Sequence, residues 1–405
     1  MRIHRAAWIL PISDPPIHNG WVAIDGGRIA AVGGSEEEPP PGTDAIDGSR
    51  ESSPSVILPG LVNAHTHIEL SWMRGKVAPD RSMPAWTSRL MGLRRTVSAD
   101  PVAPVYEAIS SARDSGTCLV GDITNTLASE EPLRGSPLSA LLFRELIGFS
   151  GTDPAGAVRR AMAECEALPV SDRIQCSIAP HAPYSVSPEL FTAIAAATRG
   201  TVVSVHLGES PEEVEFLRCG GGAWRELLEG LGVWNPGWRA PGCGPVAYLS
   251  EFGLVTEKLL AVHAVQLTDT ELATLASAGS TIVTCPRSNV WTGVGMPPAD
   301  RFYSAGVRVA VGTDSLASVD DLNMFSEIAA LRQAAVQVPA AAILESATRI
   351  GAEALGFGRD LGTIEPGKRA ELIAVRIPRD VQDVEEYLLS GVQPAAVRWL
   401  EDSET

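Results

Sequence analysis

The chain alternates between short apolar runs and longer amphipathic segments from residue 58 to about residue 355. Short runs rich in β-branched residues predict buried strands, whereas apolar positions spaced three and four residues apart predict helices. The predicted strands cover residues 61–65, 117–122, 139–147, 174–179, 201–206, 258–263, 280–285 and 307–313. The predicted helices cover residues 82–97, 102–114, 153–167, 187–198, 210–230, 268–278, 321–336 and 341–355. This alternation predicts an α/β fold, a (β/α)8 or TIM-type barrel.

The two ends of the chain have a different pattern, made of short strands and turns. Residues 21–32 hold two β-rich runs around Asp-Gly-Gly, which is typical of a hairpin. Residues 361–375 return to strand and turn sequences after the last predicted helix. We therefore expect a catalytic barrel at residues 58–359 and a small composite β-sandwich domain formed by residues 1–57 together with residues 360–405.

Composition and charge narrow the class of partner. The chain has 405 residues, and its formal net charge of −17 disfavours nucleic acid and anionic membranes as partners. No apolar run approaches the ~20 residues of a membrane span. The six cysteines are scattered without a Cys-x-x-Cys motif, which fits reduced thiols and argues against a thiolate zinc site. We therefore expect a cytoplasmic enzyme that acts on a small molecule.

Five of the seven histidines fall at or just past the end of a predicted barrel strand. In this fold class, the carboxyl ends of the strands carry the chemistry. His65 and His67 end one strand, and because alternate strand residues point the same way, both imidazoles face one side. His206 and Asp314 end two further strands. Together these four side chains offer three nitrogens and one oxygen with room for water, as in an open catalytic metal site.

Imidazole with carboxylate suits Zn²⁺, our first expectation, or Fe²⁺ as the alternative. A second metal ion would need a bridging ligand, which in folds of this kind is often a carbamylated lysine at a strand end. The chain has only three lysines, Lys76, Lys258 and Lys368, and none ends a predicted barrel strand. We therefore expect a single divalent metal ion.

Three side chains near this site are candidates for moving protons. Glu209 follows His206 in the run His-Leu-Gly-Glu, so it would lie in the loop above the metal, where a carboxylate can pass a proton between water and substrate. The alternative role for Glu209 is an acid in the first turn of the next helix. His263, at the end of its strand, would donate a hydrogen bond to the attacking oxygen. Asp314 would serve as both ligand and proton acceptor.

These pieces resemble the mononuclear aminohydrolases of the amidohydrolase superfamily, in the family's order and over about residues 1–375. The matching pieces are Pro59-Gly-Leu-Val-Asn-Ala-His-Thr-His67, His181-Ala-Pro-Tyr-Ser185, His206-Leu-Gly-Glu209, His263, Cys285-Pro-Arg-Ser-Asn289 and Gly312-Thr-Asp-Ser-Leu-Ala-Ser318. The resemblance implies metal ligands at His65, His67, His206 and Asp314, catalytic roles for Glu209 and His263, and substrate contact by His181. It also implies hydrolytic deamination, in which a metal-activated water attacks the amino-bearing carbon and ammonia leaves.

Three runs narrow the resemblance further. They look most like the aminodeoxyfutalosine deaminases of the futalosine route to menaquinone, and they are His65-Thr-His-Ile-Glu-Leu-Ser71, Phe143-Arg-Glu-Leu-Ile-Gly148 and Cys285-Pro-Arg-Ser-Asn289. Their substrate, 6-amino-6-deoxyfutalosine, is an adenine nucleoside that bears a benzoate. The methylthioadenosine/S-adenosylhomocysteine deaminases are near neighbours and remain an alternative, followed by triazine or guanine-type amidohydrolases and a non-catalytic barrel scaffold. A homodimer is possible because relatives are often dimers.

A benzoate carboxylate needs a cation, and a guanidinium group binds carboxylate in a bidentate way. Arg287, just after the seventh predicted strand, is the first candidate. Arg144, Arg89 and Arg74 are alternatives, and for each of these arginines a surface salt bridge is the competing interpretation.

Three further segments are assigned to the substrate side of the site. Glu69 is expected to hold ribose hydroxyls or, equally, to make structural hydrogen bonds at the strand exit. Ser288 lies in the same motif as Arg287 and is expected to contact substrate. Residues 219–250, which are rich in Gly, Trp and Pro, are expected to cross the barrel mouth, where such folds keep specificity.

Overall fold

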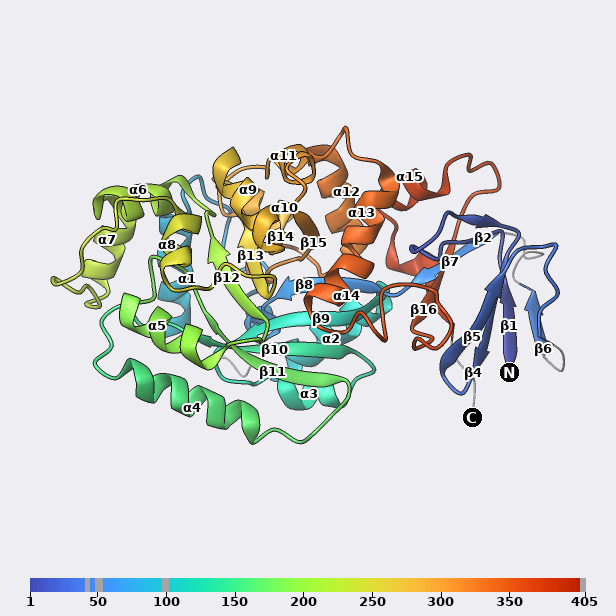
Figure 1. The fold of residues 1–405 in the computed structure, drawn as a ribbon, viewed down its shortest axis with the longest axis horizontal. Helices are drawn as coiled ribbons and strands as arrows, with labels where there is room; N and C mark the ends of the chain where they lie inside the picture. The colour runs from blue at the N-terminus through green and yellow to red at the C-terminus, as the bar shows by residue number, and fades with distance from the viewer. Residues whose placement is uncertain (41–43, 48–53, 97–101, 401–405) are drawn as a thin grey trace.

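The computed structural model describes residues 1–40, 44–47, 54–96 and 102–400, and parallel strands form its centre (Figure 1). Eight strands form two four-stranded sheets, each parallel throughout. The first has the order β11-β10-β9-β8, with β8 at Leu61–Thr66, β9 at Thr117–Thr124, β10 at Ser139–Leu146 and β11 at Ile174–Pro180. The second has the order β12-β13-β14-β15, with β12 at Val203–Leu207, β13 at Leu259–His263, β14 at Thr281–Thr284 and β15 at Arg308–Val311.

The two sheets contact each other at both edges. The backbone N–H of His206, in β12, donates to the carbonyl oxygen of His181, just after β11, at 2.9 Å. At the other edge, the N–H of Asp314 donates to the carbonyl oxygen of His65 at 3.0 Å, next to a parallel bridge between Thr66 and Asp314. The α/β class and the parallel strands are confirmed, while closure of the eight strands into one (β/α)8 barrel stays a prediction.

Most helices lie close to the predicted positions along this part of the chain, but the predicted helices 210–230 and 341–355 are each broken into two. Their bounds are α1 Met83–Thr96, α2 Val102–Asp114, α4 Pro154–Glu166, α5 Pro188–Ala197, α6 Pro211–Cys219, α7 Gly222–Gly230, α9 Asp269–Ala278, α12 Met324–Ala334, α13 Ala340–Ser346 and α14 Arg349–Ala354. The predicted helix 210–230 is broken into α6 and α7 because Gly220 adopts φ +71°, a left-handed conformation that glycine favours and that ends a helix.

Several short elements were not predicted because they are too brief for a periodic pattern. They are η2 Ile68–Met73, α3 Glu130–Arg134, α8 Pro245–Glu251, α10 Pro286–Trp291, α11 Ala299–Ser304, α15 Val384–Leu388 and η3 Pro394–Ala396. Within the described ranges, no helix combines the length and the apolar character needed to cross a bilayer.

Strands from both ends of the chain share one sheet, at the right of Figure 1. Its order is β17-β16-β7-β2-β3, with β17 at Val397–Trp399, β16 at Leu372–Arg376, β7 at Ser55–Pro59, β2 at Trp8–Ile9 and β3 at Ile17–His18. A second sheet has the order β5-β4-β1-β6, with β5 at Arg28–Gly33, β4 at Trp21–Asp25, β1 at Arg2–Arg5 and β6 at Asp44–Asp47. The division into two domains stays a prediction.

The predicted boundary after residue 57 falls inside β7. Leu58 and Pro59 still pair with Ile373 and Leu372 of β16, and the chain leaves this sheet at Gly60. A Cβ atom on Gly60 would lie 2.7 Å from the Cβ of Cys118, so glycine lets the chain pass here directly into β8.

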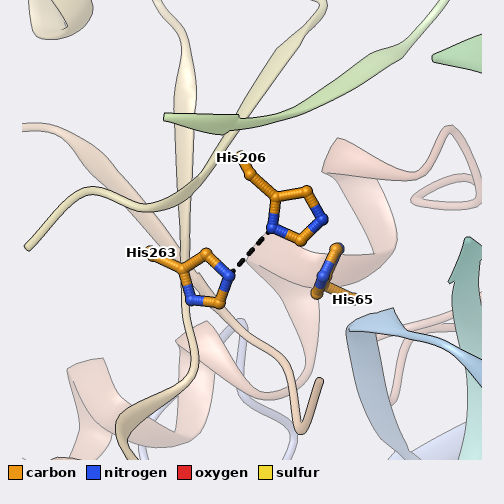
Figure 2. Close-up of side chains that lie close together, drawn as sticks. All are labelled: His65, His206 and His263. Carbon is orange, nitrogen blue, oxygen red and sulfur yellow. Dashed lines mark hydrogen bonds between the residues drawn. The ribbon is translucent and has the colours of Figure 1, made fainter. Parts of the chain in front are cut away.

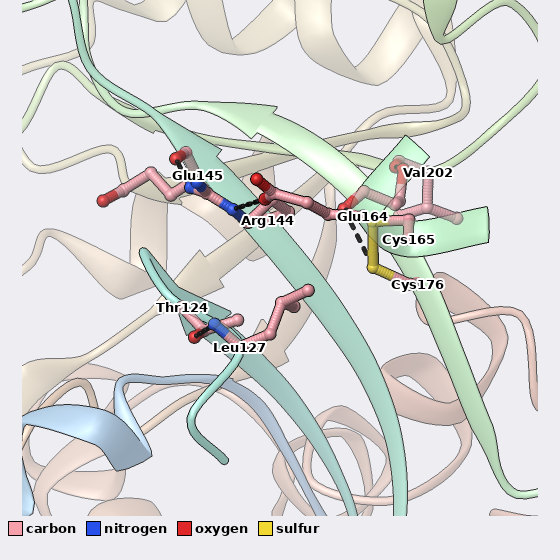
Figure 3. The surroundings of a disulfide bond; sticks show 9 residues. Thr124, Leu127, Arg144, Glu145, Glu164, Cys165, Cys176 and Val202 are labelled. Carbon is pink, nitrogen blue, oxygen red and sulfur yellow. Dashed lines mark hydrogen bonds and ion pairs between the residues drawn. A yellow bond between two sulfur atoms is a disulfide. The ribbon is translucent and has the colours of Figure 1, made fainter. Parts of the chain in front are cut away.

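Two of the six cysteines form a disulfide (Figure 3). Cys165, near the end of α4, is bonded to Cys176 in β11. The expectation of reduced thiols is therefore wrong for this pair, and the cysteine pattern no longer supports a cytoplasmic location. The pairing depends on how α4 packs against the strand that follows it, which the spacing of the cysteines does not reveal.

Candidate functional site

Ionisable side chains from both parallel sheets meet at the carboxyl ends of the strands. His65 lies in β8 and His67 immediately follows that strand. His206 lies in β12 and His263 is the last residue of β13. Asp314 follows β15 and lies beside His65 through the backbone hydrogen bond at the sheet edge.

The spacing and burial of these side chains fit a metal ion. The ligand atoms of His65, His67 and Asp314 lie within 4.8 Å of one another, and so do those of His65, His206 and His263. Nε2 of His67 lies 3.3 Å from Oδ1 of Asp314. Both ring nitrogens of His65 and Nε2 of His206 are buried without a hydrogen-bond partner in the described part of the chain. Buried polar atoms are normally satisfied, so these nitrogens suit a cation.

The protonation of the histidines agrees with this interpretation. Burial, followed by the neighbouring histidines, lowers the pKa of His65 and of His206 well below the usual value. Both rings are therefore neutral near pH 7, and neutral imidazole is the form that binds a divalent cation.

A chain of hydrogen bonds orients the rings of His206 and His263, and Figure 2 shows the contact between the two rings. Nδ1 of His263 lies 2.8 Å from Oδ1 of Asn289, and Nε2 of His263 lies 3.0 Å from Nδ1 of His206. Because an amide oxygen only accepts hydrogen bonds, Nδ1 of His263 carries its proton. Nδ1 of His206 then donates to His263, which leaves the lone pair of His206 Nε2 free for a ligand.

Backbone strain concentrates at the same residues. His263, Ala264 and Asp314 have φ of +70°, +57° and +62°, which is an uncommon conformation for residues other than glycine. Beside them, a Cβ atom on Gly312 would lie 2.7 Å from the carbonyl oxygen of His65. The close approach of the chain after β15 to β8 therefore requires glycine at position 312.

Glu209 lies next to His263 in the loop that connects β12 to α6. Its Oε1 is 3.5 Å from Nε2 of His263, and its Oε2 is 4.0 Å from Nδ1 of His206. The side chain is almost fully buried, and burial, together with the charges of Asp314 and Glu213, raises the pKa of Glu209 well above its usual value. The carboxyl group is therefore placed to hold a proton and to donate it.

The loop that carries Glu209 is fixed by its neighbours. Glu213 accepts hydrogen bonds from the backbone N–H groups of Gly208 and Glu209 at 2.8 and 3.0 Å. Ser210 caps α6, whose first residue is Pro211. Glu209 thus precedes the helix, and the alternative role as an acid of the first turn applies to Glu212 and Glu213 instead.

A cavity of about 510 Å³ opens above these side chains. His67, His181, His206, Glu209, His263 and Asp314 line it at the strand ends. Its walls are largely apolar and come from α1 and from the segment of α7 and the residues after it; they include Trp86, Leu90, Trp224, Leu227, Leu228, Leu231 and Val233. Part of the segment expected at the barrel mouth, between Trp224 and Val233, therefore contributes to the wall of this cavity.

Two residues predicted to contact substrate lie outside this cavity. Ser288 is fully buried and its hydroxyl donates to Oδ2 of Asp314 at 2.5 Å, so it orients that carboxylate. Glu69 accepts hydrogen bonds from the Thr124 hydroxyl and the Asn125 backbone N–H, each at 2.8 Å, and from Thr126. Of the two roles expected for Glu69, the structure supports the structural one.

The arginines chosen from the sequence are also engaged elsewhere. Arg287 contacts Glu327 at 2.5 Å and Asp321 at 2.8 Å. Arg144 contacts Glu164 at 2.6 Å, and Figure 3 shows it pointing toward that residue. Arg89 pairs with Asp80, and Arg74 lines a different, smaller hollow. These placements do not support any of the four as the carboxylate-binding residue.

Sequence reasoning missed several side chains at the cavity. Of the described arginines, Arg94 and Arg95 of α1 line it. Glu145 in β10 also lines it and is buried. Glu145 lies two residues before the end of the predicted strand 139–147, so the rule that selected the histidines could have found it with a slightly wider window. Arg94 and Arg95 lie at the end of an amphipathic helix, where a charged residue carries no such signal.

The sequence matches the amidohydrolase family over residues 56–392. The chain belongs to this family. The prediction of a hydrolase that acts on carbon–nitrogen bonds is therefore confirmed, and the family's dependence on metal agrees with the buried histidine and aspartate cluster.

This amidohydrolase resembles several named deaminases. It is 33% identical to the 5-methylthioadenosine/S-adenosylhomocysteine deaminase of Moorella thermoacetica, over 95% of this chain and 89% of that protein. It is 30% identical to the aminodeoxyfutalosine deaminase of Deinococcus radiodurans, over 87% and 86% of the two chains. The crystal structure of an adenosine deaminase from Xanthomonas campestris with bound zinc gives a TM-score of 0.82 at 28% identity, covering 98% of this chain and 90% of that one.

Proposed function

We propose that this amidohydrolase deaminates an adenine nucleoside derivative, converting its 6-amino group to a 6-oxo group with release of ammonia. The observation that carries the proposal is the position of Glu209. A buried carboxyl group lies beside His263 and the candidate metal ligands, at the strand-end floor of a cavity large enough for a nucleoside. The named deaminases among the relatives support the same reaction class.

His65, His67, His206 and Asp314 would hold one divalent ion, with Zn²⁺ the first candidate because the structure of the Xanthomonas campestris relative contains zinc. When bound, the ion supplies a water activated for attack on carbon. Asp314 accepts the proton of that water, and Ser288 holds its carboxylate in place for this step. His263, fixed by Asn289, orients the water.

Glu209 supplies the proton that makes the substrate reactive. It donates to the ring nitrogen beside the amino-bearing carbon, which makes that carbon electrophilic. The water oxygen bonds to this carbon, and Asp314 passes the water proton on to the amino group. The carbon–nitrogen bond then breaks to release ammonia, while the remaining hydroxyl proton returns to Glu209 and leaves the 6-oxo group. His181 lines the cavity next to His206, with ring centroids 4.9 Å apart, and is the proposed contact for the purine.

For the substrate we propose 6-amino-6-deoxyfutalosine, in menaquinone biosynthesis. The apolar walls from α1 and α7 suit an aryl group, and Arg94 and Arg95 offer the cation that its carboxylate needs. The second candidate is 5-methylthioadenosine or S-adenosylhomocysteine, which the identity to the Moorella thermoacetica enzyme favours.

A substrate screen tests both levels of the proposal. The zinc-loaded enzyme is incubated with adenosine, 5′-deoxyadenosine, 5′-methylthioadenosine, S-adenosylhomocysteine and 6-amino-6-deoxyfutalosine, while adenine absorbance and ammonia are followed. We expect turnover of adenine nucleosides, with the highest kcat/KM for the carboxyaryl compound. Turnover of none of them would overturn the proposed function, whereas a preference for the thioethers would overturn only the choice of substrate.

A further inference from the structure

A buried carboxylate that the proposed mechanism does not use lies on the floor of the same cavity. Glu145, in β10, is 5% exposed and lines the cavity. Figure 3 shows its side chain extending away from the pair formed by Arg144 and Glu164. Its Oε1 lies 4.0 Å from Nε2 of His206, whereas Glu209 lies on the opposite, Nδ1, edge of the same ring. The cavity floor therefore carries two acids, separated by His206.

Glu145 is held in place through Asn125. The side-chain NH2 of Asn125 donates to Oε2 of Glu145 at 2.8 Å. The amide oxygen of Asn125 faces the guanidinium of Arg94, at 3.4 and 3.5 Å, so the two ends of the amide have distinct partners. Glu69 accepts the backbone N–H of Asn125 and binds both flanking threonines, which fixes the turn that carries the amide.

One oxygen of Glu145 remains free to bind substrate. Oε2 is occupied by Asn125, and no residue in the described part of the chain donates a hydrogen bond to Oε1. Because Glu145 lines the cavity, a ligand there that supplies a hydrogen-bond donor can bind this oxygen. A carboxylate accepts hydrogen bonds and does not donate them, so the matching ligand group must be a donor.

The chemistry of an adenine nucleoside offers few such donors. Its ring nitrogens N1, N3 and N7 are acceptors, and its 6-amino group has to lie at the Glu209 side, where it leaves. The remaining donors are the hydroxyl groups of the ribose. We propose that Glu145 is the specificity residue that accepts the ribose hydroxyls, with Asn125 and Glu69 as its positioning residues. This inference rests on the proposed deamination of an adenine nucleoside.

The test compares substrates that differ only in these hydroxyls. The zinc-loaded wild type and the Glu145→Gln variant are assayed with adenosine, 2′-deoxyadenosine and 3′-deoxyadenosine. In the Glu145→Gln variant, the side-chain oxygen at this position still accepts the hydrogen bond from the NH2 of Asn125. The new side-chain NH2 then faces the cavity, and it cannot accept a hydrogen bond from the substrate. A hydrogen bond to a charged group contributes about 10- to 100-fold in binding. Wild type should therefore prefer adenosine by at least about tenfold in kcat/KM over one deoxy analogue, and Glu145→Gln should reduce that ratio to below about threefold.

Two further variants separate specificity from structure. Glu164→Gln, a matched change at an exposed acid of α4 near the same strand, should keep the wild-type ratio. Asn125→Ala should lower the ratio in the same direction as Glu145→Gln, mainly through KM for adenosine, with zinc content unchanged.

The outcomes distinguish this inference from the proposed function. Equal turnover of adenosine and both deoxy analogues by wild type would overturn the inference alone. An equal loss for all three substrates in Glu145→Gln, accompanied by loss of zinc, would make Glu145 a metal ligand and also overturn it. Failure of wild type to deaminate any adenine nucleoside would overturn the proposed function, and the inference with it.

Discussion

Glu209 and His263 make the site a candidate for proton transfer as well as for metal binding. The two side chains contact each other at 3.5 Å, and Asn289 and Glu213 fix them from behind. A site that only binds a metal ion would need the ligand side chains but no proton donor beside them. Glu209 is a buried carboxyl group whose pKa is raised by burial, and it can supply the proton that hydrolytic deamination needs.

Glu209→Gln should therefore lower kcat by about 100-fold or more, because general acid catalysis typically contributes ~10²–10⁴. Zinc content should remain that of wild type, since the ligand side chains are unchanged. Steady-state kinetics with the best nucleoside of the screen, together with elemental analysis, measure both. Glu215→Gln, at an exposed acid of α6, is the control. A variant that kept most of its kcat would exclude Glu209 as the proton donor.

His65→Asn should lose the bound metal. Both ring nitrogens of His65 are buried without a hydrogen-bond partner in the described ranges. The imidazole therefore makes no hydrogen bond to these parts of the chain that would explain its position, and metal binding is the role that the substitution removes. We expect elemental analysis to find less than about one tenth of the wild-type zinc after dialysis, because open sites have few ligands to spare. The control variant His18→Asn changes an exposed histidine and should retain the zinc content of wild type. Full zinc occupancy in His65→Asn would show that the ion is held elsewhere.

At the residue scale, the sequence predicted the side chains whose position depends on the end of a strand. It did not predict side-chain partners that come from distant segments of the chain. The metal-ligand candidates follow directly from their positions in β8 and β12 and just after β8 and β15. Arg287 has the right position in the chain, but Glu327 of α12 and Asp321 occupy its guanidinium. No local sequence pattern indicates those two partners, so the arginine that binds the substrate carboxylate could not be chosen from the sequence.

At the scale of elements, α1 determines one wall of the cavity. It places Trp86 and Leu90 along that wall and Arg94 and Arg95 at its end. The amphipathic pattern predicted this helix within a residue or two, but not which of its faces meets the site. That face depends on packing against α7. The sequence pattern predicted α6 and α7 as one helix, whereas in the structure the left-handed Gly220 separates them.

The double variant Arg94→Ala/Arg95→Ala should raise KM for 6-amino-6-deoxyfutalosine by about 10-fold or more, since a charge-assisted contact contributes ~1.5–3 kcal/mol. KM for 5′-methylthioadenosine, which has no carboxylate, should change by less than about threefold. Arg89→Ala, on the same helix but paired with Asp80, is the matched control. An equal rise in KM for both substrates would mean that these arginines maintain the shape of the cavity wall and do not bind the carboxylate.

At the scale of the whole molecule, one buried acid links β9 to η2 and to the start of α3, and it makes stability depend on pH. Asp122 in β9 accepts the backbone N–H of Ile68 at 2.8 Å and contacts the Ser129 hydroxyl. Burial raises the pKa of Asp122 to about 7, whereas in an unfolded chain it is about 3.9. Between these values the folded protein keeps the proton that the unfolded chain gives up, so rising pH favours unfolding.

Asp122→Asn should weaken this dependence, because the amide stays neutral and can keep both contacts. We expect the urea midpoint of wild type to fall between about pH 5 and pH 7.5, and that of Asp122→Asn to fall less, by a free energy on the order of a few kcal/mol. Asp14→Asn, at an exposed acid, should behave like wild type. Parallel pH profiles for Asp122→Asn and wild type would contradict the assignment.

The shared terminal sheet has a consequence for how the protein is made. β7 is synthesised early, but its partner β16 lies beyond all eight parallel strands in the chain. While the chain is still on the ribosome, the apolar strand Ser55–Pro59 therefore has an open edge on one side, and such edges promote aggregation. Nascent chains that stall before residue 372 should depend on chaperones, whereas completed chains cover this edge with their own last strands.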